Sequence, residues 1–244
     1  MRGKIWSIYL TVAALTPALV VPVSAYKESG VKGGGSISGT IKFDGAVPAL
    51  KKLSVNKDKK VCDKKPIHDE SLVVKDGGVQ WAVVSLKGVK SGKKWGALKK
   101  AVMDQDGCRY KPHVIVMKAG EKLTALNSDK ILHNFHTHPG KTKNKVANVA
   151  QPKFKKKLRL SKRYFKKSGI MKLTCDVHDW MEGYIVVADN PYHVVSGEGG
   201  KFKIADVPAG SYTLEIWHQS LGTKSMKVEV KAGADYTVEA TLKK

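Results

Sequence analysis

The chain has 244 residues, of which 44 are Lys or Arg and 21 are Asp or Glu, so its formal net charge is +23 at pH 7. Runs of β-branched residues bounded by glycine-rich turns outnumber helical patterns, which excludes a helical bundle and predicts an all-β protein of two small domains. Such a charge favours anionic partners, but nucleic acid is not expected because the sequence has no aromatic-basic recognition motif.

The first 25 residues have the pattern of a secretory signal. Arg2 and Lys4 precede an apolar run over 5–23, and Val23-Ser24-Ala25 supplies a small-x-small cleavage site. The sequence therefore predicts a signal peptide over 1–25 and export to the periplasm or another extracytoplasmic space. An uncleaved N-terminal anchor is the alternative, but two prolines and the small-residue exit favour cleavage. After cleavage we do not expect an integral membrane protein.

Residues 26–105 are predicted to form an N-terminal β segment. The glycine-rich stretch 33–36 is typical of a flexible lead, and 38–43 and 71–74 are predicted as short strands that end at glycine-containing turns. The more apolar stretch 79–86 is predicted as a buried strand.

The segment 106–188 contains the next set of predicted strands. Their expected ranges are 114–117, 123–127, 154–160, 171–175 and 184–188. Met171, Leu173 and Cys175 alternate with polar residues, so a strand of period two should carry the Cys175 sulfur to the same buried side as its apolar neighbours.

The loop that follows has the pattern of a metal site. Cys175, His178 and Met181 are spaced three residues apart, about forty residues after the histidine-rich run His133–His138. A thiolate, imidazoles and a weak axial thioether are the ligands that hold copper for one-electron transfer. The alternative is that the Cys and the Met are core fillers and the His a surface residue. The polar loop between two strands favours the copper site.

The segment from about 108 to 188, a third of the chain, resembles the cupredoxin (blue copper, plastocyanin-like) family. In that family the first ligand is a His followed by Asn, a few residues after a strand that ends in Asn. His133-Asn134 after Asn127 fits this pattern. The short spacing of the ligand loop is most similar to that of the amicyanin-type members. A dinuclear copper centre would need a second Cys in the loop.

The resemblance implies a Greek-key β-sandwich that carries single electrons and holds one type 1 copper. The ligands that it implies are His133, Cys175, His178 and Met181. The imidazole edge of His178 is then the expected electron exit. We do not expect an enzyme, because the oxidases and reductases of this lineage need a further, catalytic copper with several His ligands. Only His136 and His138 could supply the first ligands of such a site. These two are predicted as partly exposed rim residues, with a second metal site as the alternative.

The other two cysteines are predicted to pair. Disulfides persist outside the cytoplasm, and Cys62 and Cys108 lie on polar stretches away from the ligand loop, which leaves Cys175 free for metal. Two unpaired thiols would be the alternative, which is uncommon in an oxidising space.

Residues 189–244 resemble a second family, the carboxypeptidase-regulatory, transthyretin-like β-sandwich module. The stretch 199–204 followed by 206–214 carries this resemblance, and apolar residues alternate with Lys, Glu and Thr through the strands that follow. A unit this short buries little by itself, so it should pack on the copper domain or recruit the N-terminal strands.

The stretch 141–170 contains 12 basic residues and no acidic residue. Within it, the apolar residues Phe154, Leu158 and Leu160 alternate with the basic residues Lys155, Lys157 and Arg159. The positive field predicts docking of an acidic redox protein such as a cytochrome, or attachment to an anionic surface or polysaccharide. A solvated face kept for solubility is the alternative.

The function predicted from the sequence is an exported electron carrier. The alternatives are a non-redox module that binds glycan or a cell surface, and a copper-storage protein.

Overall fold

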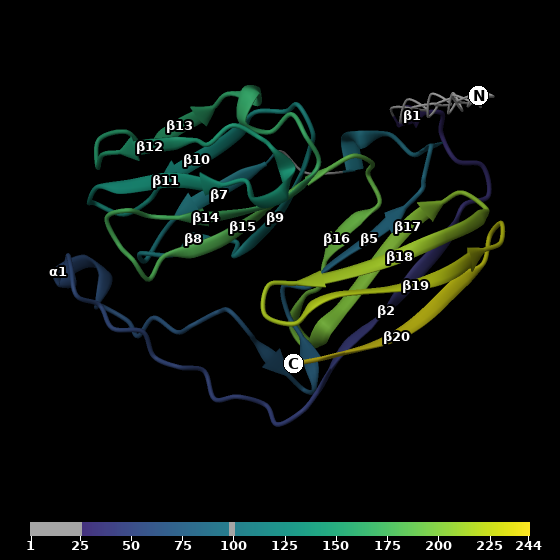
Figure 1. Cartoon of the computed structure of the whole chain (residues 1–244), viewed down its shortest axis with the longest axis horizontal. Helices are drawn as coiled ribbons and strands as arrows, with labels where there is room; N and C mark the ends of the chain where they lie inside the picture. Colours follow the sequence, from purple (N-terminus) through teal and green to yellow (C-terminus); the bar gives the residue numbers. More distant parts are fainter. Residues whose placement is uncertain (1–25, 98–100) are drawn as a thin grey trace, which may run out of the picture.

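The computed structural model describes residues 26–97 and 101–244; the predicted signal peptide lies outside the described residues. The described chain is built almost wholly from β-strands in two sandwiches, which confirms the all-β prediction (Figure 1). Its helices are α1 (Lys59–Cys62) and the 3-10 turns η1 (Trp95–Ala97), η2 (Gly140–Thr142), η3 (Lys162–Tyr164) and η4 (Glu198–Gly200). No helix of this part of the chain is long and apolar enough to cross a membrane.

The first sandwich consists of two sheets. One sheet has the order β13-β10-β7-β8, with β7 (Val102–Gln105), β8 (Tyr110–Lys111), β10 (Leu123–Asn127) and β13 (Lys157–Leu160). The other has the order β12-β11-β14-β15-β9, with β9 (Val114–Lys118), β11 (His133–His138), β12 (Asn148–Gln151), β14 (Gly169–Thr174) and β15 (Glu182–Ala188). The predicted ligands all lie on, or just after, strands of this second sheet.

Alternating apolar residues build the core of the first sandwich. In β10, Leu123 and Ala125 are buried while the residues between them are half-buried, and in β14 Met171 and Leu173 repeat this period of two. The largest buried side chains between the sheets include Phe135, which lies two residues after His133 at the start of β11. The predicted ligand residues are therefore positioned by a packed core rather than by a free loop.

The second sandwich joins the two ends of the chain. One sheet has the order β16-β5-β18-β19, with β5 (Val83–Lys87), β16 (His193–Val195), β18 (Gly210–His218) and β19 (Gly222–Val230). The other has the order β17-β2-β4-β3, with β2 (Gly35–Asp44), β3 (Val74–Lys75), β4 (Gly78–Val79) and β17 (Lys201–Val207), and β20 (Asp235–Lys243) pairs in parallel with β2. A small ribbon pairs β1 (Lys27–Glu28) with β6 (Ser91–Gly92). The C-terminal strands thus recruit N-terminal strands, one of the two alternatives that the sequence allowed.

The first sandwich is inserted between strands of the second. The predicted segment 26–105 is divided, because β2 to β5 lie in the second sandwich while β7 pairs with β10 of the first. The two sandwiches touch through buried Val83, Val114 and Val186, with Trp81 and Trp217 packed against this cluster. This contact holds the two sandwiches together.

Three predicted ranges differ from the strands observed. Strand β2 begins at Gly35, inside the stretch expected to be a flexible lead. The expected strand 79–86 is broken at Trp81, whose φ of 66° bends the chain between β4 and β5. Phe154 was expected to face inward, but it is 81% exposed, since the N–H of Lys155 closes a turn onto the carbonyl of Pro152 before β13 begins.

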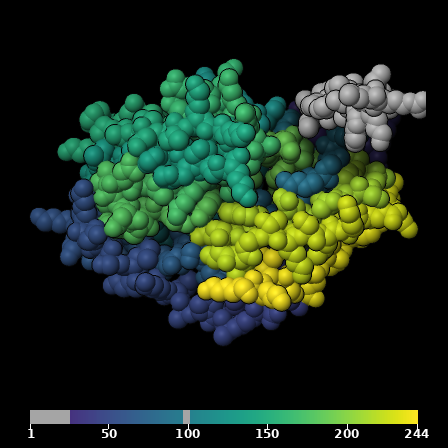
Figure 2. Space-filling view, in the orientation of Figure 1, coloured from purple at the N-terminus to yellow at the C-terminus, as the bar shows by residue number. Residues whose placement is uncertain are grey.

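A long connection between β2 and β3 reaches across the molecule. It leaves the second sandwich, runs beside the first and carries α1 to the far end of the first sandwich (Figure 1). In Figure 2 its blue atoms lie against the green atoms of the first sandwich. A piece of chain that belongs to one sandwich therefore covers part of the other.

Candidate metal centre

Two neighbouring strands bring three of the predicted ligands together. Strand β11 begins at His133 and pairs antiparallel with β14, which ends one residue before Cys175. The turn 176–181 returns the chain to β15, and the N–H of Met181 donates to the carbonyl of His178 at 3.0 Å. The pairing of the two strands places His133 beside the thiol, and the turn places His178 there as well.

Three donor atoms converge in a buried site. The Nδ1 atoms of His133 and His178 are 3.1 Å apart, and the Cys175 sulfur is 3.7 Å from Nδ1 of His178. One ligand atom from each residue lies within 4.8 Å of the others, and all three residues are buried. The site therefore presents two nitrogens and one sulfur to a single point.

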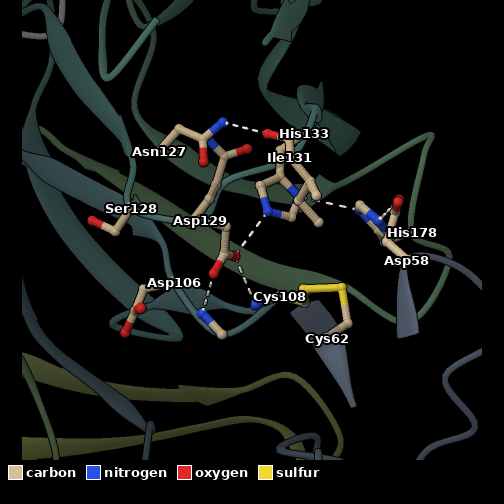
Figure 3. A network of polar contacts seen from close by, with 12 residues as sticks. Asp58, Cys62, Asp106, Cys108, Asn127, Ser128, Asp129, Ile131, His133 and His178 are labelled. Carbon is tan, nitrogen blue, oxygen red and sulfur yellow. Dashed lines mark hydrogen bonds and ion pairs between the residues drawn. A yellow bond between two sulfur atoms is a disulfide. The ribbon is translucent and has the colours of Figure 1, made fainter. Parts of the chain in front are cut away.

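The hydrogen bonds at the outer ring nitrogens define which inner atoms are free. Nε2 of His133 is 2.9 Å from an Asp129 carboxylate oxygen, and Nε2 of His178 is 2.9 Å from an oxygen of Asp58 (Figure 3). Because an ionised carboxylate only accepts hydrogen bonds, each Nε2 carries the hydrogen. In the neutral rings both Nδ1 lone pairs then face each other at 3.1 Å, an arrangement that a shared proton or cation stabilises.

The separations of the donor atoms fit one metal ion. Nitrogen and sulfur ligands that lie about 2.0 and 2.3 Å from an ion of tetrahedral geometry are about 3.3 Å apart for two nitrogens and about 3.5 Å apart for nitrogen and sulfur. The observed 3.1 and 3.7 Å are close to these values. The donor types, one thiol and two imidazoles, match the equatorial set that copper prefers in electron-transfer sites.

Asp129 holds the ring of His133 in place. Its carboxylate accepts the N–H groups of Gly107 and Cys108, both at 2.9 Å, in addition to Nε2 of His133. Burial would raise the pKa of Asp129, but these hydrogen bonds, that from His133 foremost, outweigh it and lower the pKa. Burial likewise would lower the pKa of His133, but Asp129 and the Cys175 side chain outweigh it and raise the pKa. The imidazole is thus fixed in position from behind.

Cys175 has the chemistry of a metal ligand. It is the free cysteine of the described chain and is 3% exposed. Burial alone would raise its pKa, but hydrogen-bond contacts with the rings of His133 and His178 and the backbone N–H groups of Val177 and Asn134 outweigh burial and lower the pKa to about 6. Since the thiolate is the form that binds metals, the site favours the reactive form near neutral pH.

Asn134 connects the two halves of the site. Its backbone N–H donates to the Cys175 sulfur at 3.3 Å, and its side-chain oxygen accepts the N–H of Asp176 at 3.3 Å. Its side-chain nitrogen donates to Asn148 on β12 at 2.7 Å. The residue after His133 therefore fixes the ligand loop to the strand that carries the first ligand.

The imidazole edge of His178, the expected electron exit, is covered. The side chain of His178 has no exposed surface, because Asp58 covers Nε2 and the Trp180 ring lies 5.1 Å away at a tilt of 54°. Asp58 comes from the long connection that carries α1, 120 positions earlier in the chain. Nothing in the spacing of the ligand loop indicates this cover.

The predicted disulfide is confirmed. Cys62 and Cys108 are bridged, with 46 positions between them in the chain. Figure 3 shows the bridge beside the two histidine–aspartate pairs. The Cys108 sulfur lies within 4.8 Å of ligand atoms of Asp129 and His133. The bridge therefore joins α1 to the back of the metal centre, a position that the sequence did not indicate.

Met181 is buried at the end of the ligand turn. It is 1% exposed and belongs to the core of the first sandwich. The indole N–H of its neighbour Trp180 donates to the carbonyl of Cys108 at 3.2 Å, which fixes this end of the turn to the disulfide. The assignment of Met181 as the axial ligand stays a prediction.

The remaining histidines of the run point outward. His136 is half-buried, with Nδ1 2.7 Å from a carboxylate oxygen of Asp176, and His138 is exposed and contacts the Thr174 hydroxyl at 2.7 Å. Their rings are 4.3 Å apart. They lie at the rim, as the alternation along the strand predicts, and His133 points to the buried side.

The basic residues predicted for docking are exposed. Lys155 lies on the turn before β13, and Lys157 and Arg159 alternate in β13 with Leu158 and Leu160, which face the core. The exposed ring of Phe154 adds an apolar side chain to this basic stretch. Whether a partner docks there stays a prediction.

Two residues of the candidate site, Asp129 and Asp58, could not be found by the pattern of the ligand loop. Asp129 is four positions before His133, a spacing that could have indicated a carboxylate behind the ligand. Asp58 has no such signal, because a charged residue in a polar connection looks like any solvated side chain. Its role follows from the fold alone.

The comparisons give partial matches. A family model of polysaccharide lyase family 4, domain II, matches residues 163–238, from η3 into β20. This is not the carboxypeptidase-regulatory module, so that resemblance stays a prediction. Among curated proteins, none matches the sequence.

Solved structures that are similar to part of the chain include copper proteins. A purple cupredoxin from Nitrosopumilus maritimus is 20% identical with a TM-score of 0.30, over 36% of this chain and 100% of its own. Amicyanin from Paracoccus versutus is 19% identical with a TM-score of 0.31, over 37% and 82%. A copper-containing nitrite reductase from Thermus scotoductus is 18% identical with a TM-score of 0.31, over 37% and 22%. TM-scores this low carry no argument, so the candidate site depends on its own geometry.

Proposed function

We propose that this protein is an exported carrier of single electrons that holds one type 1 copper. Its proposed ligands are His133, Cys175, His178 and Met181. The observation that supports this best is the convergence of two imidazole nitrogens on a buried thiol whose pKa is lowered to about 6. Copper bound there would supply a one-electron redox couple, with the thioether as the weak axial contact.

The surrounding residues hold the donors in place. Asp129 and Asp58 fix the two rings through Nε2, and the N–H of Asn134 fixes the sulfur. Hydrogen bonds of this kind keep ligands in one orientation and limit their movement between oxidation states. A site held by strands and by the disulfide suits a carrier, which needs no open position for a substrate.

The charge and the disulfide support an extracytoplasmic carrier. A bridge between Cys62 and Cys108 persists in an oxidising compartment, in agreement with the predicted signal peptide. The proposed partner is an acidic redox protein such as a cytochrome, steered by the stretch 141–170. The protein would act as a carrier rather than as an enzyme.

A second candidate is a non-redox exported module that binds glycan or surface material. The match of residues 163–238 to a polysaccharide lyase domain favours it. In that case a bound metal would be structural or stored, and the copper(II)-loaded protein would lack the intense visible thiolate band. The visible spectrum of the copper(II)-loaded protein thus separates the two candidates.

The ligand assignment is tested by two substitutions. Cys175→Ser should abolish the intense visible thiolate band of the copper(II) protein, because the thiolate supplies the charge-transfer donor. Met181→Leu should keep the band and shift the reduction potential, since the axial bond is weak. Retention of the full band in Cys175→Ser would contradict the assignment.

A further inference from the structure

The connection that carries α1 forms a closed loop over the first sandwich. Its base is held by the N–H of Leu53 on the carbonyl of Ile67 and by the N–H of Asp69 on that of Lys51, both at 2.8 Å. We call residues 51–69 the cap. A loop whose two ends are joined by backbone hydrogen bonds is expected to move as one unit rather than as a flexible linker.

The cap is docked on the core of the first sandwich. Val55, Cys62 and Ile67 are each less than 9% exposed and belong to that core cluster. The disulfide to Cys108 fixes the same piece covalently. Apolar burial and a covalent bond together favour a permanently seated cap over a transient contact.

The Asp58 side chain is aimed at the metal centre instead of at its own helix. Asp58 is the residue before α1, where an Asp side chain commonly caps backbone N–H groups, yet it forms no such cap here. Its backbone is left-handed, with φ 49° and ψ 36°, a conformation that Asp tolerates better than most residues. The carboxylate contacts Nε2 of His178 at 2.9 Å instead (Figure 3).

The Asp58 carboxylate lies between the ring of His178 and the solvent. The Asp58 side chain keeps 36% of its surface in solvent, while the His178 side chain has none. At the side of the cap, Asn56 donates to the Asp179 carboxylate at 3.4 Å, so the cap also holds the residue next to the ligand. Any molecule that approaches His178 from this side meets Asp58 first.

We propose that Asp58 is a positioning residue of the metal centre and that the cap closes the outer edge of His178 to external ligands and docking partners. The inference depends on the proposed metal binding by His178. The carboxylate acts through the ring: it holds the hydrogen on Nε2 and thereby keeps Nδ1 as the inner donor. Electrons would then leave through another face of the first sandwich.

The first test needs no metal. The full metal-free protein is treated with diethylpyrocarbonate at neutral pH, and modification of each histidine is followed by peptide mass spectrometry, with exposed His68 and His138 as internal references. His178 should react at least tenfold more slowly than the references in the wild type. It should approach their rate in Asp58→Ala and stay protected in Asp58→Asn, which keeps an oxygen acceptor. A wild-type His178 as reactive as His68, or one still protected in Asp58→Ala, would overturn the proposal.

The second test uses the copper-loaded protein. Asp58→Asn should raise the reduction potential, because a neutral amide stabilises the more positive ion less than a carboxylate does. Asp58→Ala should weaken copper binding by about ten- to a hundredfold, the usual effect of losing such a partner. Asp179→Asn is the matched control, since it removes the same charge from the next residue without touching a ring.

An equal shift of the potential in Asp58→Asn and Asp179→Asn would mean that charge alone acts, and would overturn the positioning role. If the wild type binds no copper, the proposed function fails, and the labelling experiment still decides whether the cap closes His178. If Asp58→Ala does not fold, the test is the reduction potential of Asp58→Asn compared with that of Asp179→Asn.

Discussion

Asp129 and Asp58 act alike on two histidines from different parts of the chain. Each accepts Nε2–H at 2.9 Å and leaves Nδ1 directed to the Cys175 sulfur side of the site. The ligand residues could be predicted from the sequence, because thiol, imidazole and thioether at three-residue spacing form a local pattern. Of their carboxylate partners, Asp129 lies four positions before His133, a spacing that a sequence pattern could have indicated. Asp58 could not be predicted, because a hydrogen bond between segments 120 positions apart leaves no periodic trace in the sequence.

Asp129→Asn should damage both the fold and the site. An amide cannot accept all three hydrogen bonds from Gly107, Cys108 and His133 without turning its NH₂ group towards one of them. We expect the free energy of unfolding to fall by about 2–3 kcal/mol and copper affinity to fall about tenfold or more. Chemical denaturation and competition with a chelator measure the two effects.

Asp106→Asn is the control for this prediction. It removes a carboxylate from the same region, but one that forms only an exposed ion pair with Lys111. Its effect should stay below about 1 kcal/mol. Equal losses in the two variants would show that Asp129 has no special role behind His133.

At the level of elements, strand identity was more predictable than strand limits. Alternation marked the strand that ends just before Cys175 correctly, since Met171 and Leu173 are both buried. The same pattern failed at Phe154, because a turn interrupts it before β13. A period of two does not reveal where the ladder of backbone hydrogen bonds starts.

The disulfide should contribute to stability through the cap. Replacing Cys62 and Cys108 with Ala removes a crosslink that spans 46 positions, which the chain-entropy model values at about 4 kcal/mol. The free energy of unfolding from guanidinium titration should fall by about this amount. The cap should also loosen, so His178 should react faster with diethylpyrocarbonate. Unchanged unfolding energy and unchanged labelling would contradict a structural role for the bridge.

At the level of the whole molecule, the first sandwich is inserted into the second. The all-β class followed from composition and patterning, and the recruitment of N-terminal strands was one of two expected arrangements. The cap could not be predicted, since Asp58 precedes the ligand that it covers by 120 positions. Contacts of this range are set by the topology of the two sandwiches, which no local pattern specifies.

Acid should destabilise the second sandwich through His193. Burial and the charge of Lys87 lower the pKa of His193 to about 4, from the 6.5 of an unperturbed imidazole. Between these two pH values the unfolded chain binds the extra proton, so stability is full above pH 6.5 and is lost as the pH falls to 4. The loss should be about 3 kcal/mol.

The comparison that isolates this effect is the pH dependence of unfolding in two variants. His193→Gln should show a smaller loss of stability between pH 6.5 and 4 than the wild type. His68→Gln, at an exposed position, should follow the wild-type curve. Parallel curves for wild type and His193→Gln would contradict the buried neutral imidazole.

Docking through the basic stretch should depend on salt. The Debye length falls from about 10 Å at 0.1 M to about 3 Å at 1 M, so the second-order rate of electron transfer with an acidic cytochrome should fall steeply. Replacing Lys155, Lys157 and Arg159 with Glu should lower the rate in the same way and leave the copper spectrum unchanged, because these side chains face solvent.

The matched control reverses three exposed lysines of the second sandwich. Lys224, Lys227 and Lys231 change to Glu with the same change of net charge. A rate that responds equally to both triple variants would mean that net charge, and not the stretch 141–170, steers the partner.

The proposed single copper–thiolate centre is tested most directly by titrating the metal-free protein with copper(II) while recording its visible spectrum. We expect an intense thiolate charge-transfer band that grows to saturation at one copper per chain and is reversibly lost on one-electron reduction. A colourless complex, or a band that does not respond to reduction, would contradict an electron-transfer site at Cys175, His133 and His178.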